Sequence, residues 1–214
     1  MQRLTPPRPG QARARGFTLV ETMVALVIMG VLLSVGIPSM SRWIFSNKAA
    51  SASQFYAEGF AMARNQALTH NGASRLVLTE NAGNRQFNWQ VDICFPSPEA
   101  PCTAASANWS TATTVAPRDP EGDAGFKSLL RRADALPAAS ELAPGVDPEG
   151  ARAVYFTPLG WVNPAFAPYV QRIELTPSAR HPDTQASAVV LTLAGIATRC
   201  KPGVADSDLQ RCPP

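Results

Sequence analysis

The chain has 214 residues, of which 45% are hydrophobic and 16% are charged, enough for one domain together with an anchor. Its formal charge is +3, but residues 1–16 carry four arginines and no acid. Without that segment the formal charge would be −1, so the basic balance does not argue for a nucleic-acid partner.

An apolar run follows this basic segment. Residues 17–37 are apolar or small, apart from Glu21 and a few hydroxyl side chains. At a rise of ~1.5 Å per residue, the run spans roughly 30 Å, which is the thickness of a bilayer core. The basic flank predicts that residues 1–16 stay in the cytoplasm while the rest of the chain crosses outward.

The helical pattern continues beyond this run. Small and aromatic residues recur at helical spacing: Phe45, Ala49, Ala52, Tyr56, Ala63 and Ala67. The pattern stops at Asn71-Gly72, a typical helix end. We therefore predict one helix of roughly 55 residues, with a membrane-spanning half over 17–38 and an amphipathic half over 39–72.

The remainder, 73–214, has the alternation of β-strands. Residues 74–80 and 86–95 alternate on either side of the turn 81–84, which predicts a hairpin. Four later segments have the same character: 126–131, 152–157, 169–176 and 187–194. The predicted fold class is α+β, a ladle in which the long N-terminal helix packs on an antiparallel β-sheet domain.

Two segments between the strands, 96–125 and 133–150, are rich in Pro, Ala, Ser and Asp. We expect them to form long surface loops that add little to the core. Trp109 lies in the first loop, where it either contacts a partner or folds back onto its own sheet.

The four cysteines, Cys94, Cys102, Cys200 and Cys212, all follow the apolar run. An even number in an outward-facing, oxidising compartment predicts disulfides. Three pairings are possible, and short loops favour Cys94–Cys102 and Cys200–Cys212. Zinc competes weakly, because the chain has no CxxC pair and its two histidines lie far from any cysteine in sequence.

Motifs of enzymatic chemistry are missing from the sequence, which has no G-x-S-x-G, phosphate-binding loop or HExxH. We predict no catalytic residue, no cofactor and no metal site. His70 is interpreted as a helix cap and His181 as a solvated loop residue. The stretch Asp119–Asp123 suggests calcium only weakly, because it lacks a full set of oxygen ligands.

Residues 15–21, RGFTLVE, resemble the processing site of type IV prepilins and type II secretion pseudopilins. The resemblance implies that a prepilin peptidase cuts between Gly16 and Phe17 and methylates the new N-terminus at Phe17. It also implies a single-pass protein of the inner membrane with a periplasmic C-terminal domain. Its partners would be other pilins or pseudopilins and the inner-membrane assembly platform. The alternative is an uncleaved signal anchor that never polymerises.

Glu21 is the one charge in the apolar run, where a carboxylate costs on the order of 3 kcal/mol at mid-bilayer. The resemblance implies that it pairs with the free amine of Phe17 on a neighbouring subunit during assembly. The alternative is that Glu21 lies within about a turn of the mature end and reaches the headgroups.

Two internal stretches, 62–78 and 156–162, resemble the GspH/FimT branch of this family, and Cys200 matches its late cysteine. The resemblance implies a minor subunit near a filament tip. Some members take part in DNA uptake through a GRxR motif, but in 195–200 Ile196 and Thr198 replace the two arginines. A DNA contact through Arg199, Lys201 and Arg211 is the open alternative to three scattered surface cations.

Overall fold

The computed structural model describes residues 16–213, so the leader apart from Gly16 lies outside the described range. The chain divides into two units, with the boundary between Ser41 and Arg42. Every strand and every buried side chain of the described residues belongs to the second unit.

The predicted long helix is confirmed, because α1 (Leu19–His70) contains 52 residues. Thr18 caps its start: the Thr18 Oγ1 accepts a hydrogen bond from the backbone N–H of Glu21 at 3.2 Å. Glu21 also places a carboxylate in the first turn, where the helix dipole favours negative charge.

The helix ends where its sequence predicts. Asn71 takes a left-handed conformation with φ 47°, and the N–H of Gly72 donates to the carbonyl of Ala67 at 3.2 Å. This is a Schellman motif, which satisfies carbonyl groups that the last turn would otherwise leave unpaired.

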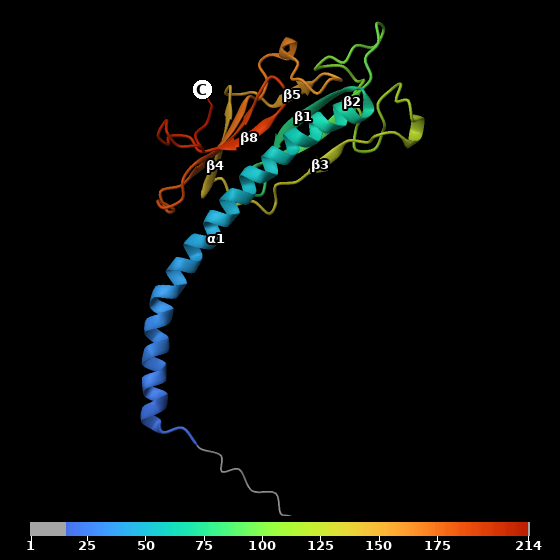
Figure 1. The fold of residues 1–214 in the computed structure, drawn as a ribbon. Helices are drawn as coiled ribbons and strands as arrows, with labels where there is room; N and C mark the ends of the chain where they lie inside the picture. Colours follow the sequence, from blue (N-terminus) through green and yellow to red (C-terminus); the bar gives the residue numbers. More distant parts are fainter. Residues whose placement is uncertain (1–15, 214) are drawn as a thin grey trace, which may run out of the picture. The chain divides into compact units, whose positions relative to one another are not determined.

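The second unit contains two four-stranded antiparallel sheets (Figure 1). The first sheet has the order β3-β2-β1-β5, and its strands are β1 (Ala73–Glu80), β2 (Phe87–Cys94), β3 (Leu129–Arg131) and β5 (Ala153–Phe156). The second has the order β4-β6-β7-β8, and its strands are β4 (Leu142–Asp147), β6 (Arg172–Pro177), β7 (Ser187–Leu191) and β8 (Ala197–Cys200). A long helix on antiparallel sheets confirms the predicted α+β class, although two sheets stand where we expected one.

The predicted first hairpin is also confirmed. β1 and β2 pair over their full lengths, with Ala73 opposite Cys94 and Glu80 opposite Phe87. In the turn, the Asn81 side chain accepts from the N–H of Gly83 at 2.9 Å, as asparagine commonly does in tight turns.

The interpretation of 133–150 as a surface loop was wrong, because β4 lies inside it. Pro144 and Gly145 interrupt the alternation of apolar and polar residues from which a strand is predicted, so the sequence did not indicate β4. The strand tolerates a proline because β4 is the edge of its sheet, where one side of the backbone needs no partner.

Two other strand boundaries differ from the prediction. The segment 187–194 is not one strand: β7 stops at Leu191, and the chain turns back into β8. The segment 126–131 contributes only the short strand β3. In 187–194 the turn after Leu191 contains residues apolar enough to continue a strand pattern, and in 126–131 Lys127 forms only an isolated bridge with Val115.

The prediction that the loops add little to the core was also wrong. Cys102, Trp109 and Ala133, all from these loops, are at most 9% exposed. The Trp109 indole packs near Tyr155, with ring centroids 5.8 Å apart, and its Nε1 donates to the carbonyl of Thr103 at 2.8 Å. Trp109 therefore folds back onto its own domain.

The core lies between the C-terminal half of α1 and the sheets, and its contacts explain the small residues of the helix. Trp89, 2% exposed, donates from its Nε1 to the carbonyl of Phe55 at 3.0 Å. A Cβ at Gly59 would lie 3.1 Å from that indole ring, so glycine allows this close approach. The hydroxyl of Ser74 in β1 donates to the carbonyl of Ala63 at 2.6 Å. This bond attaches the sheet to the helix about one turn beyond Gly59.

A buried polar group fixes the other end of the helix–sheet contact. Tyr56 donates from its hydroxyl to Gln86 Oε1 at 3.0 Å and accepts from the N–H of Phe87 at 3.0 Å. The Gln86 amide in turn donates to the carbonyls of Pro137 and Leu142. Gln86 is completely buried, so these bonds take the place of the hydrogen bonds that its side-chain amide makes to water in the unfolded chain.

Candidate functional site

The residues predicted to take part in processing and assembly lie exposed at the start of the helix. Gly16 and Phe17 precede the helix, and Phe17 is 80% exposed. Glu21 is exposed in the first turn. These three residues are therefore accessible and lie within six positions of one another.

The apolar side chains of this part of α1 contact no core. None of the most apolar window of the helix is buried, and large side chains such as Leu26 and Leu32 are 70% and 67% exposed. Among the described residues, α1 is the one helix long and apolar enough to cross a membrane. Such a surface requires either lipid or the apolar faces of other helices around it.

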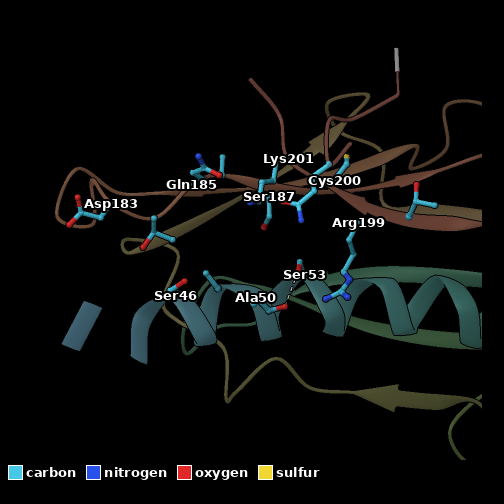
Figure 2. Close-up of a pocket in the computed structure, with 14 residues that line it drawn as sticks. Ser46, Ala50, Ser53, Asp183, Gln185, Ser187, Arg199, Cys200 and Lys201 are labelled. Atoms are coloured by element: carbon cyan, nitrogen blue, oxygen red, sulfur yellow. Dashed lines mark hydrogen bonds between the residues drawn. The ribbon is translucent and has the colours of Figure 1, made fainter. Parts of the chain in front are cut away.

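The three cations considered for DNA contact are not equivalent. Arg199 and Lys201 line a cleft of 780 Å³ between α1 and the β8 region, and Figure 2 shows Arg199 extending from β8 toward the helix. Arg211 does not line this cleft, and its guanidinium pairs with Asp206 at 2.8 Å. The structure thus places two of the three in the cleft, while the backbone of Arg211 lies beside that of Lys201.

The cleft itself is polar but not purely basic. Small and hydroxyl side chains of α1, including Ser46 and Ser53, form its floor, and Asp183 stands at its rim. A neighbouring hollow of 650 Å³ shares Arg199 and adds Glu58. The same hollow also contains Arg131, and Asp183 pairs with Arg42, so Arg199 lies among charges of both signs rather than in a purely basic field.

His181 is not the solvated residue that we expected. Its ring stacks on Phe45 of α1 with centroids 3.4 Å apart and an interplanar angle of 8°. The prediction failed because a proline-flanked polar loop looked solvent-exposed, whereas this loop folds over the helix. An exposed ion pair between Arg42 and Asp183, 3.3 Å apart, joins the same loop to α1.

Asp119 has a structural role in its loop. It is 8% exposed, and its carboxylate accepts from the N–H groups of Glu121 and Phe126 at 3.0 and 3.2 Å. Within residues 16–213 no cluster of three or more acidic, histidine or cysteine side chains has the arrangement of a metal site.

Each cysteine forms a disulfide with the cysteine that is nearest to it in sequence. Cys94 at the end of β2 is joined to Cys102, and Cys200 at the end of β8 is joined to Cys212. The first disulfide belongs to a buried cluster with Trp109 and Tyr155, while the second attaches the C-terminal tail to the sheet edge.

A surface that we did not predict is built from two turns with the same pattern, T-x-x-G followed by a large apolar residue. In each, the threonine hydroxyl accepts from the N–H four residues later: Thr157 from Trp161 at 3.3 Å and Thr192 from Ile196 at 3.2 Å. Their glycines, Gly160 and Gly195, have φ of 73° and 76°. The repeat of TPLGW and TLAGI was the signal that could have revealed this pair.

The two turns are stacked on each other and on the end of α1. The N–H of Val162 donates to the carbonyl of Leu193 at 2.9 Å. A Cβ at Gly195 would lie 2.1 Å from the carbonyl oxygen of Gly160, so only glycine fits there. Arg64 of α1 packs against both glycines and donates from its Nε to the carbonyl of Ala194 at 3.4 Å. We call this unit, residues 157–161 and 192–196, the twin-turn surface.

Comparison with known proteins identifies the N-terminal segment. Residues 11–37 match the prokaryotic N-terminal methylation motif, a type IV prepilin-like signal. No curated protein and no solved structure matches the chain. The motif covers the expected processing site and the apolar run, so it supports a structural protein of the pilin or pseudopilin type. Together with the apolar helix, it is compatible with a single-pass inner-membrane protein.

Proposed function

We propose that this protein is a minor pilin or pseudopilin of the GspH/FimT type, a structural subunit of a type IV pilus or a type II secretion pseudopilus. The observation that carries the proposal is the methylation motif at 11–37, which overlaps the start of a helix whose apolar side chains there meet no core. A filament supplies the neighbouring helices that such a surface needs.

In this proposal, residues 1–16 are a leader that prepilin peptidase removes, and Phe17 becomes the methylated N-terminus. Residues 17–38 cross the inner membrane, 39–72 continue the helix, and 73–214 form a periplasmic domain. Glu21 attracts the amine of Phe17 on a neighbouring subunit, because opposite charges attract strongly in an apolar bundle. The β-domain would then select partners near the filament tip.

The test is the intact mass and the N-terminal sequence of the protein recovered from membranes, with and without a prepilin peptidase. We expect a mature chain that starts at methylated Phe17 only when the peptidase is present. Gly16→Leu should block the cut, while Gly30→Leu, a matched change inside the apolar helix, should leave it intact. A chain that retains residues 1–16 in the presence of the peptidase would leave the signal-anchor alternative.

A DNA-contacting subunit is the second candidate, and the observation in its favour is that Arg199 and Lys201 line one cleft. It requires DNA binding that weakens steeply with salt and that is lost in a variant with both cations changed to alanine. The pairing of Arg211 with Asp206 and the mixed charges beside Arg199 favour the purely structural candidate.

A further inference from the structure

Large apolar side chains gather on the twin-turn surface. Leu159 is 67% exposed, Trp161 60%, Leu193 61% and Ile196 52%, and Leu68 of α1 adjoins them with 42% of its surface exposed. Contiguous apolar surface of this kind marks an interaction site on a folded protein. Trp is also the residue type most enriched among the side chains that dominate binding energy.

This surface is held in one conformation before any partner arrives. Each turn is closed by a backbone bond from its glycine, at 2.8 Å in the first turn and 2.9 Å in the second, besides its threonine bond. The contact between Gly195 and Gly160 then locks the turns together. A preformed surface loses little conformational entropy on binding, which favours affinity.

The chain segments that contain and flank the two turns carry charges of one sign. Segments 157–171 and 187–205 contain two charged residues, Arg199 and Lys201, and no acid. Arg64 lies against the turns, and in the described part of the chain no carboxylate pairs with it. An apolar surface with a basic neighbour is complementary to apolar side chains flanked by carboxylates.

We propose that the twin-turn surface is the docking site for a different subunit of the same filament, which presents apolar side chains flanked by carboxylates. The inference rests on the proposed function and names the partner chemistry. A two-fold contact with a second copy would bring two Arg64 guanidinium groups together, and like charges oppose that pairing. A different subunit avoids this repulsion.

The experiment places a photo-crosslinking phenylalanine derivative at position 161 of the full-length chain, in the cells that produce it. Cross-linked products from membranes are identified by mass spectrometry. We expect a partner that carries its own prepilin-type N-terminal motif. The same probe at position 209 is the matched control, because Leu209 is a fully exposed leucine outside the surface. It should give no such product.

Variants test the two parts of the contact. Leu159→Ser together with Leu193→Ser should lower the cross-linked yield about tenfold, as expected for the loss of central apolar contacts. Leu209→Ser should not change it. Arg64→Glu should lower the yield, and Arg64→Lys, which keeps the charge, should retain most of it. Thermal unfolding of each variant separates lost docking from lost folding.

Three results would overturn the inference: cross-links to lipid, cross-links only to a second copy of this chain, or a yield that the variants leave unchanged. Processing at Gly16 and incorporation into filaments are measured in the same samples. If both occur normally and no subunit is captured at position 161, the docking inference fails while the proposed function stands. If neither occurs, the proposed function itself fails.

Discussion

At the scale of single residues, the Tyr56 hydroxyl connects the helix to the sheets. It donates to Gln86 and accepts from the backbone of Phe87 in a buried environment. Tyr56→Phe would leave both of these groups without their partner, at a cost of about 1–3 kcal/mol in the free energy of unfolding. Chemical denaturation measures this directly. Tyr155→Phe is the control, because the Tyr155 hydroxyl makes no hydrogen bond within residues 16–213. Equal losses in the two variants would contradict the assigned role.

The same residue predicts a response to alkaline pH. Burial raises the pKa of the Tyr56 hydroxyl well above its ordinary value, although the bond from the Phe87 N–H opposes this. The unfolded chain ionises near pH 10 while the native chain stays neutral, so this group removes stability as the pH rises above about 10. At pH 11 the wild type should lose about 1 kcal/mol more than Tyr56→Phe, relative to pH 7. Identical pH profiles would show that Tyr56 is not shielded.

At the scale of elements, the contact between α1 and β2 depends on the missing side chain at position 59. A Cβ there already lies 3.1 Å from the Trp89 ring, so Gly59→Leu must displace the indole from its bond to Phe55. We expect destabilisation of about 1–3 kcal/mol from overpacking, measured by thermal unfolding. The control is Ala61→Leu, at an exposed position of the same helix. If Gly59→Leu is as stable as this control, the packing argument is wrong.

The two disulfides should differ in what they stabilise. Cys94 is fully buried beside Trp109, so replacing Cys94 and Cys102 with serine removes a cross-link and places hydroxyl groups in an apolar cluster. Replacing Cys200 and Cys212 releases the exposed tail at the sheet edge and places one hydroxyl at Cys200, which is 7% exposed and lies outside the aromatic cluster. Each closed loop is worth roughly 3 kcal/mol in the chain-entropy account. We expect the first pair to cost clearly more than the second in denaturant titrations, and the reverse order would contradict this.

The elements also show how far a sequence pattern can lead. The helix and the first hairpin follow from periodicity and from the Asn71-Gly72 stop, since these depend on local chemistry. β4 was not predictable in this way, because its Pro144 is tolerated only where the strand lies at a sheet edge. The stacking of His181 on Phe45 depends on a contact between distant segments, which no local pattern encodes.

The residues of the candidate site likewise differ in how far the sequence alone predicts them. The motif at 11–37, which contains Gly16 and Phe17, could be recognised because it is linear in the sequence. Arg199 and Arg211 are close in sequence but have different surroundings, which only the fold decides. The twin-turn surface shows this most clearly, since its two turns are 35 positions apart along the chain and become one surface through a glycine-to-glycine contact.

At the scale of the whole molecule, the chain combines a helix that needs an apolar environment with a domain that has its own core. The buried residues extend from Phe45 to Cys200, so removing side chains before Arg42 should not disturb the domain. The charge at Glu21 can therefore be tested for assembly without a loss of folding.

We predict that Glu21→Ala leaves synthesis, membrane insertion and cleavage after Gly16 unchanged but lowers incorporation into filaments at least about tenfold. The reason is that a carboxylate in an apolar bundle stabilises assembly only through an opposite charge on a neighbour. Sheared filaments are compared with membranes by immunoblotting. Glu58→Ala, on the exposed face of the same helix beyond the apolar run, is the control and should assemble normally. Glu21→Asp should restore part of the incorporation, because it keeps the charge and shortens its reach. If Glu21→Ala assembles as the wild type does, the carboxylate acts only at the headgroups and does not set the position of one subunit against the next.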